Sequence, residues 1–296
     1  MSAAPRKPEK SAPATQGIAV VTGAGSGIGA ALCRELARRG ARVIAADIDR
    51  QSVAEVCAAI RITGGNATHA VLDVTVSDDV EALAAATVAA EGHIDLWINN
   101  AGIAVGGATN ELALADWRRV LDVNLSGVIH GVHAVYPRMV RQGFGHLVNI
   151  ASVAGLAPYP LALPYTTSKH AVVGLSQALR AEARAHGVRV SVACPGMVRT
   201  PIWERSEIRG ELGRGRDRLL ARLPKVMSPA TCAAAIVRGI AANRGIIPVT
   251  VEAHVAWWLN RLSPALAANL SQQLAGFARR LARAARVPTS AHAQRR

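Results

Sequence analysis

The sequence predicts an α/β fold built on a doubly wound parallel sheet with helices on both faces. Short apolar, β-branched runs alternate with longer segments of helical periodicity along most of the chain, and this alternation is typical of parallel sheets buried on both sides. A glycine-rich turn joins the first expected strand to the first helix. Polar residues follow several of the expected strands, at the sheet edge where such folds bind ligands.

The first strand is expected at 18–22, a short apolar and β-branched run. It leads into Gly23-Ala24-Gly25-Ser26-Gly27-Ile28-Gly29, and a helix over 27–39 follows, ending at Gly40. Glycines let the backbone approach a phosphate, and a helix N-terminus offers N–H donors and partial positive charge. The three features in sequence therefore favour a site for a dinucleotide pyrophosphate over a plain tight turn.

Asp47 is a second indication of a nucleotide site. It follows the strand expected at 42–46 and lies twenty residues after Gly27. A carboxylate at that place can accept hydrogen bonds from both hydroxyls of an adenosine ribose, whereas it would repel a 2′-phosphate. Its register with the turn favours cofactor binding over a merely solvated strand end.

The remaining elements continue the same alternation, so we expect about seven parallel strands. Strands are expected at 18–22, 42–46, 68–72, 94–98, 145–150, 188–193 and 246–249. Helices are expected at 27–39, 50–62, 78–91, 116–142, 165–186 and 229–243.

Tyr165 and Lys169 lie four residues apart in an expected helix, which places both side chains on one face. A free phenol titrates near ~10, and a nearby positive charge favours its ionised form. The pair is therefore predicted to supply a proton donor whose pKa the ammonium lowers. The spacing alone is common, and its weight comes from the nucleotide site upstream.

Together these motifs resemble the classical branch of the short-chain dehydrogenase/reductase family. The glycine pattern Thr22-Gly23-x-x-x-Gly27-x-Gly29 has that family's form. The resemblance covers roughly residues 16–250 and implies a Rossmann-like fold. Further matches follow in the family's order: Asp73-Val74, Asn99-Asn100-Ala101-Gly102, Asn124, Ser152, Tyr165 with Lys169, and Pro195-Gly196-Met197-Val198-Arg199-Thr200.

The resemblance implies a catalytic set of four residues. Tyr165 would be the general acid and base, and Ser152 would donate a hydrogen bond to the substrate oxygen. Lys169 would stabilise the phenolate and hold the nicotinamide ribose. Asn124 would hold a water that links Lys169 to solvent.

The resemblance also implies cofactor contacts beyond the turn and Asp47. Asp73 and Val74 would meet the adenine, and Asn100 and Gly102 the adenosine ribose. Asn99 is expected to tie neighbouring strands together instead, and Met197 to pack. The full expected cofactor set is Gly23, Ser26, Gly27, Ile28, Gly29, Asp47, Asp73, Val74, Asn100, Gly102, Tyr165, Lys169, Pro195, Gly196, Val198 and Thr200.

Asp47 favours NAD over NADP, and the uncharged Ser26 agrees, since family members that prefer NADP usually carry a basic residue there. Arg50 is the dissenting feature. The expected function is hydride transfer between nicotinamide and a secondary alcohol or ketone. An NADP-preferring ketoreductase and a catalytically silent NAD-binding regulator remain alternatives.

Three segments should frame the substrate pocket: 153–163, the loop after Gly102, and 200–225. The first is almost entirely apolar, which favours a steroid-, retinoid- or lipid-like substrate. The third mixes arginines with acids and glycines, and we expect a mobile lid whose arginines form a solvated face.

The segment 251–296 extends beyond the catalytic domain expected at 16–250. Ser263 and Pro264 form a helix-start signal. A narrow apolar stripe follows, with arginines mostly on the other side; it comprises Leu266, Leu270, Leu274, Phe277 and Leu281, opposite Arg279, Arg283 and Arg286. This helix is expected to pack on a partner subunit or roof the pocket, with membrane-surface contact as the alternative.

Composition narrows the function further. The net charge is +14 over 296 residues, but the basic residues are spread out and aromatics are 3%, so nucleic-acid binding is not expected. Residues 1–15 are rich in Ser, Ala, Pro and Lys and are expected to be a flexible tail. They lack the apolar run of a secretory signal. Four scattered cysteines predict neither a disulfide framework nor a metal site. We expect a cytoplasmic homo-oligomer, dimer or tetramer.

Overall fold

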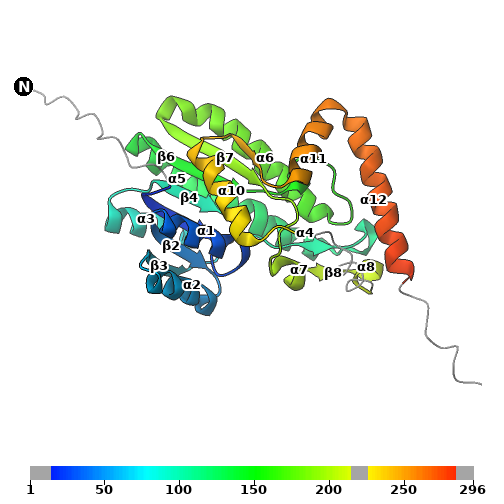
Figure 1. Ribbon diagram of the computed structural model, residues 1–296, viewed down its shortest axis with the longest axis horizontal. Helices are drawn as coiled ribbons and strands as arrows, with labels where there is room; N and C mark the ends of the chain where they lie inside the picture. Colours follow the sequence, from blue (N-terminus) through cyan, green and yellow to red (C-terminus); the bar gives the residue numbers. More distant parts are fainter. Residues whose placement is uncertain (1–14, 215–225, 285–296) are drawn as a thin grey trace, which may run out of the picture.

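The computed structural model describes residues 15–214 and 226–284, and its centre is a seven-stranded parallel sheet (Figure 1). The strand order is β3-β2-β1-β4-β6-β7-β9, so the sheet winds outward in both directions from β1 and β4 and confirms the predicted fold class. The strands are β1 (Ile18–Thr22), β2 (Arg42–Asp47), β3 (Asn66–Val71), β4 (Leu96–Asn99), β6 (Gly145–Ile150), β7 (Val188–Cys194) and β9 (Ile246–Pro248).

Helices cover both faces of the sheet because successive strand residues point to opposite sides. Ala19 and Val21 of β1 pack with α1 (Gly27–Arg38), α2 (Arg50–Ile62) and α10 (Pro229–Ala241). Ile18 and Val20 pack in a second cluster on the other face. That cluster includes residues of α3 (Ser77–Glu91), α5 (Gly127–Gln142) and α6 (Leu163–Ala183).

The helix expected over 116–142 is interrupted, which the sequence did not predict. It divides into α4 (Leu114–Leu121), a π-helical turn at Asp122–Ser126, and α5. Asn124 lies in the turn, and its side chain is bonded to another segment rather than exposed. Wide turns of this kind occur often at functional sites.

A small second sheet joins two segments that the sequence placed in loops. β5 (Val105–Gly106) pairs in parallel with β8 (Glu207–Ile208), between the short helices α7 (Ile202–Arg205) and α8 (Gly210–Arg214).

Ion pairs strengthen this junction: Arg209 lies 2.7 Å from Asp116, and Arg119 lies 2.7 Å from Glu207. The described half of the expected lid is thus tied to α4, and residues 215–225 lie outside the described residues.

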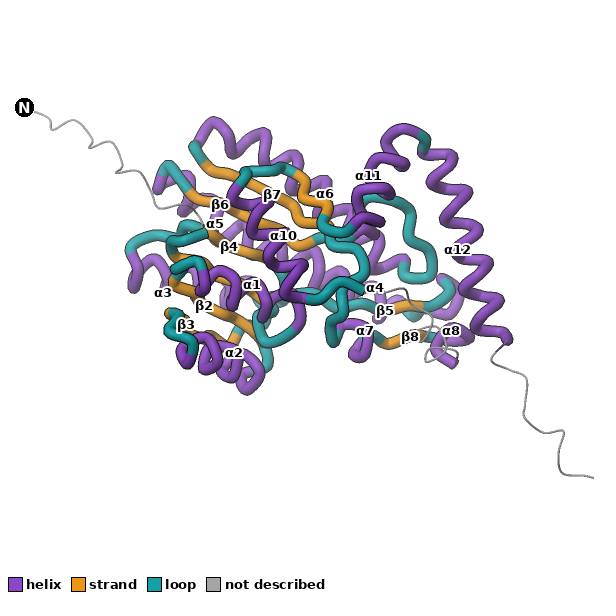
Figure 2. Tube along the Cα trace, in the orientation of Figure 1, coloured by secondary structure: helices purple, strands orange, loops and turns teal. Residues whose placement is uncertain are grey.

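Two helices follow the sheet and lie at the right of Figures 1 and 2, where the second packs against α8. They are α11 (Val251–Leu262) and α12 (Pro264–Ala284). The Ser263 hydroxyl accepts a hydrogen bond from the Leu266 amide at 3.4 Å, so α12 begins where its start signal was predicted. Among the described helices, none combines the length and apolar character needed to cross a bilayer. Arg286 and the tail 1–14 fall outside the described residues, as do the side chains of Leu281 and Arg283.

Candidate active site

The carboxyl ends of β1, β4 and β6 open onto one cavity of about 570 Å³, at the point where the strand order reverses. Its lining includes every residue predicted from the sequence to bind the cofactor, together with Ser152. Asn124 is not among the described residues that line it. The topology therefore gathers residues spread from Gly23 to Thr200 around one cavity. It places Asn124, a predicted catalytic residue, outside the described lining of that cavity.

Glycine is required by the geometry of the turn after β1. Gly23 and Gly27 have φ angles of +63° and +55°, in the left-handed region that favours glycine. A Cβ atom on Gly29 would lie only 2.1 Å from the Gly23 carbonyl oxygen. The turn thus brings bare backbone and the N-terminus of α1 to the cavity wall, which is the cradle that a pyrophosphate needs.

Asp47 is fixed by the turn and still faces the cavity. One carboxylate oxygen accepts a hydrogen bond from the Gly25 amide at 2.8 Å, and the other accepts from the Asp49 amide at 3.0 Å. A carboxylate has about four acceptor positions, so acceptor capacity remains for two ribose hydroxyls. Arg50 is exposed at the start of α2, and the arginines that line the described part of the cavity are Arg119 and Arg205.

Two asparagines at the carboxyl end of β4, Asn99 and Asn100, make structural contacts. The Asn100 amide nitrogen donates to the carbonyls of Thr22 and Gly23, at 2.9 and 3.0 Å, so it braces the glycine turn. Asn99 accepts from the Trp97 indole at 2.7 Å and donates to Asn149 at 2.9 Å. The prediction that Asn99 ties strands together is confirmed, since it links β4 to β6. The bracing role of Asn100 was missed.

Asn124 is fully buried and grips the peptide of Ile103 from both sides. Its side-chain oxygen accepts from the Ile103 amide at 2.8 Å, and its nitrogen donates to the Ile103 carbonyl at 2.9 Å. The same nitrogen donates to Ser168 at 3.1 Å, one residue before Lys169. The side chain therefore fixes the loop after Gly102 and the helix that carries Lys169, rather than facing the cavity.

Tyr165 and Lys169 lie on the first turns of α6 and face the cavity together with Ser152. The Lys169 ammonium is buried, donates to the Ile150 carbonyl at 2.9 Å, and lies 5.5 Å from the centroid of the Tyr165 ring. Ser152 begins the 3₁₀ turn η3 (Val153–Gly155) and accepts a hydrogen bond from the Ala154 amide at 3.2 Å. The phenol of Tyr165, the hydroxyl of Ser152 and the ammonium of Lys169 thus line the same cavity as the glycine turn after β1.

Burial dominates the electrostatics of this group, contrary to the sequence prediction that the ammonium lowers the phenol pKa. Loss of solvent raises the pKa of Tyr165 to about 12, and a hydrogen bond with Ser152 offsets part of that rise. Loss of solvent also lowers the pKa of Lys169 to about 8. Desolvation penalises both charged forms, so burial favours the neutral phenol of Tyr165 and the neutral amine of Lys169.

All three segments expected to frame the substrate pocket contribute to the cavity. Ile103 and Ala104 come from the loop after Gly102, and Ile202 comes from α7. Leu156 of the expected wall is instead buried in the core. The wall residues that do line the cavity are Val153, Ala154, Tyr159 and Ala162. Arg205 also lines it while remaining exposed, although the sequence suggested only a solvated face.

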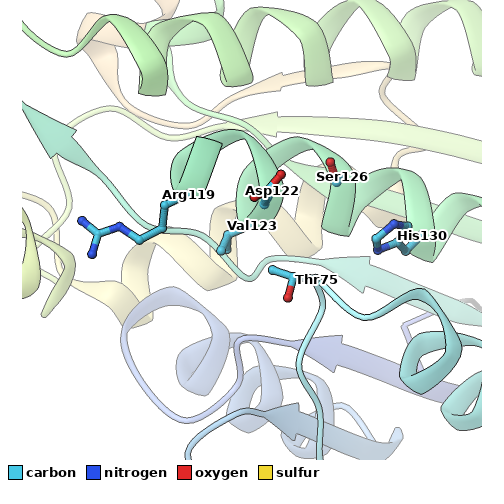
Figure 3. A pocket seen from close by; sticks show the side chains of 6 residues that line it. All are labelled: Thr75, Arg119, Asp122, Val123, Ser126 and His130. Carbon is cyan, nitrogen blue, oxygen red and sulfur yellow. The ribbon is translucent and has the colours of Figure 1, made fainter. Parts of the chain in front are cut away.

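A second hollow of about 630 Å³ lies on the outer side of α4 and α5 (Figure 3). No residue of the predicted site lines its described part; the lining residues are Thr75, Arg119, Asp122, Val123, Ser126 and His130. Arg119 borders both hollows, and its pairing with Glu207 accounts for its charge. Sequence spacing carried no signal for Arg119. Across the described residues, no cluster of three or more metal-ligating side chains is present.

Comparisons with known proteins agree with this geometry. The chain is 37% identical over 255 residues to the "Probable oxidoreductase EphD" of Mycobacterium tuberculosis, a match that covers 82% of this chain and 43% of EphD. The chain thus spans less than half the length of that relative. It is also 37% identical over 212 residues to 2-(R)-hydroxypropyl-CoM dehydrogenase of Xanthobacter autotrophicus, covering 70% of this chain and 84% of the relative.

A solved structure of a short chain dehydrogenase/reductase from Burkholderia phymatum in complex with NAD superposes with a TM-score of 0.76. The two are 34% identical, and the match covers 84% of this chain and 94% of that one. The family model described as short chain dehydrogenase matches residues 17–209. With its glycine turn, its strand order and its matched span in agreement, the chain belongs to the short chain dehydrogenase family.

Proposed function

We propose that the protein is an NAD-dependent oxidoreductase acting on a hydrophobic secondary alcohol or ketone. The observation that carries the proposal is the convergence of Tyr165, Lys169 and Ser152 on the cavity that also contains the glycine turn and Asp47. Proton transfer and cofactor binding require those two groups in one place. Nicotinamide, when bound, supplies or accepts the hydride.

The protein's residues would hold and move the proton. The Tyr165 hydroxyl gives its proton to a carbonyl oxygen in reduction, or takes one from an alcohol in oxidation. Ser152 donates a hydrogen bond to the same substrate oxygen. The Lys169 ammonium, anchored on the Ile150 carbonyl, holds the nicotinamide ribose and favours the phenolate. Asn124 acts as a positioning residue through Ile103 and Ser168.

Preference for NAD is supported by Asp47 at the ribose position and by the uncharged Ser26. A family member that is 34% identical has been solved with NAD. NADP is the competing cofactor, and it is favoured by Arg205, which lines the same cavity as Asp47. Steady-state kinetics with both cofactors decides, and a kcat/KM about tenfold better with NADP would reverse the proposal.

Support for a hydrophobic substrate comes from Val153 and Ala154 of the apolar wall and from Ile202 of α7, which line the cavity. Support for a secondary alcohol as substrate comes from the relative named 2-(R)-hydroxypropyl-CoM dehydrogenase, because a 2-hydroxypropyl group is a secondary alcohol. We further propose a catalytic domain over 16–250 that works in the cytoplasm as a homo-oligomer. The four cysteines are buried and unpaired, which suits a reducing compartment.

The test is a screen of hydrophobic secondary alcohols with NAD, read by the absorbance of the reduced cofactor. Replacing the phenol in Tyr165→Phe should lower kcat by about 10²–10⁴-fold, the usual contribution of a general acid or base. Cofactor affinity, measured by fluorescence titration, should change less than about twofold, since ribose and pyrophosphate contacts remain. Tight NAD binding without turnover of any substrate would instead support a silent regulator.

A further inference from the structure

The two C-terminal helices carry most of the large apolar side chains that remain exposed. Eight of the fifteen exposed large hydrophobic residues in the described chain lie in α11 and α12. The others are scattered over the rest of the molecule, where single exposed apolar residues are ordinary. The concentration of exposed apolar side chains on one pair of helices indicates a surface that binds a partner.

Helix α12 packs on the protein through its small residues rather than its large ones. Ala267 is buried, and Ala268, Ser271 and Ala275 are half-buried. The Ser271 hydroxyl donates to the Pro158 carbonyl at 2.5 Å. Leu266, Leu270, Leu274 and Phe277, called here the α12 stripe, remain 42–62% exposed. The side that a globular protein normally buries therefore faces outward.

Helix α11 repeats this arrangement. Ala253 is buried in a core cluster that also contains Leu156 and Val172, and Trp257 packs against this cluster. Exposed apolar residues recur along its other side at helical spacing, and they are Val251, Val255, Trp258 and Leu262. Both helices thus turn a narrow apolar band to solvent.

Charge distinguishes between the two partners that could cover these apolar bands, a second copy of the chain and a lipid surface. After Glu252 the sequence contains no acidic residue, whereas it contains seven arginines up to its end. Among the described ones, Arg261, Arg279 and Arg280 are exposed, and Arg279 lies on the side of α12 opposite the stripe. A second copy would bring another basic extension and another net charge of +14 to the contact. An anionic surface complements this charge, and arginines beside a surface helix favour anionic lipid.

We propose that the α12 stripe docks on the surface of an anionic lipid bilayer, with α11 contributing further apolar surface. Helix α12 lies next to a segment that lines the substrate pocket, since it is bonded to Pro158, the residue before Tyr159, and it packs against α8. Docking would hold the pocket near the bilayer, where a lipid-like substrate is dissolved. The docking surface itself does not depend on the proposed activity and is tested without substrate.

The experiment measures cosedimentation of the full chain with phosphatidylcholine vesicles, with and without phosphatidylglycerol. The test variant is Leu270→Glu with Leu274→Glu, within the α12 stripe. The control is Asn269→Glu with Gln272→Glu, which makes the same change of charge at exposed positions on the other side of α12. Circular dichroism and NAD affinity check that each variant folds.

The protein should bind the vesicles containing phosphatidylglycerol, and added salt should weaken the binding. The stripe variant should lower the partition coefficient at least about tenfold, because two apolar side chains leave the interface. The control should lose far less. Equal losses in both variants would mean that net charge alone binds, and absence of binding to any vesicle would also overturn the proposal. Dissociation of an oligomer by the stripe variant, seen by ultracentrifugation, would show a subunit interface instead.

Discussion

Replacing Lys169 by methionine should stabilise the fold while abolishing catalysis. The ammonium is buried, it donates a hydrogen bond to the Ile150 carbonyl, and burial lowers its pKa from 10.5 to about 8. Methionine has a similar length, is apolar and adapts to irregular spaces. The variant Lys169→Met therefore removes a charge that the fold holds at a cost.

The magnitude follows from the shift in pKa. Each pKa unit corresponds to about 1.4 kcal/mol, so holding the charged form of Lys169 costs the folded state about 3 kcal/mol below pH 8. The lost hydrogen bond to Ile150 has a charged donor and offsets about 2 kcal/mol of this gain. The free energy of unfolding of Lys169→Met should therefore exceed that of the parent by about 1 kcal/mol at neutral pH.

The dependence on pH identifies the cause. Because the folded-state pKa is lowered, the unfolded chain binds more protons between pH 8 and 10.5, and the parent gains stability as the pH rises through that window. The advantage of Lys169→Met should be complete below pH 8 and should shrink toward pH 10.5. Urea unfolding of both proteins at several pH values measures the difference, in which other titrating groups cancel.

Two results would refute this reasoning. One is a methionine variant less stable than the parent at neutral pH, which would mean that the ammonium is better satisfied than its environment indicates. The other is a difference in stability that does not change between pH 8 and 10.5. Turnover should fall at least about 100-fold in either case, because the group that holds the ribose and favours the phenolate is lost.

Three further predictions concern other parts of the sheet edge and core. Asp47→Ala should weaken NAD binding about tenfold and narrow the preference for NAD over NADP, measured as a ratio of kcat/KM, since the ribose acceptor and the partner of the Gly25 amide are lost together. Asn99→Ala should lower the free energy of unfolding by about 2–4 kcal/mol, because the Trp97 indole loses its buried acceptor. Burial holds the pKa of His146 at about 3, against 6.5 when unfolded, so stability should fall as pH drops below 6.5, and His146→Leu should flatten that acid dependence in urea titrations.

The parts of the fold that the sequence predicted depend on neighbours in the chain. Positive φ angles at Gly23 and Gly27 require glycine wherever the rest of the molecule lies. Strand ends in a parallel sheet meet at one edge, so the order of strands and motifs along the chain was enough to assign Asp47, Ser152 and Thr200 to one cavity. Boundaries were predicted less accurately, and β3 and β4 differ from their predicted ranges by one or two residues at either end.

The roles of particular amides could not be predicted in the same way, because their partners are distant in sequence. Asn124 matched the motif, yet its contacts are Ile103 and Ser168, which only the packed structure brings to it. Asn100 was assigned to the ribose from its motif, and the hydrogen bond by which it also braces Thr22 was missed. The position of a residue in a motif indicates that it belongs to the site. Its hydrogen-bond partners in the folded protein show whether it also holds a neighbouring segment in place.

The sign of the Tyr165 pKa shift has the same origin. The spacing of Tyr165 and Lys169 correctly placed a cation beside the phenol, at 5.5 Å from its ring centroid. Spacing cannot report how much solvent both groups lose, and that loss moves the two pKa values toward about 12 and about 8. A nearby positive charge favours the phenolate, but in this site the solvent that both groups lose decides the direction of the two shifts.

Helix α12 shows where the reasoning from apolar periodicity needs a second criterion. Its stripe of large residues predicted an amphipathic helix correctly, and the usual inference places that stripe against the core. Instead Ala267 and Ser271 lie against the protein, because small side chains allow the close approach that the Pro158 segment demands. Large residues then remain outside, on a helix whose exposed residues also include Arg279 and Arg280. The segment after Glu252 carries arginines and no acidic residue. Its exposed apolar stripe therefore indicates a surface that contacts another partner, and its positive charge indicates that this partner is anionic.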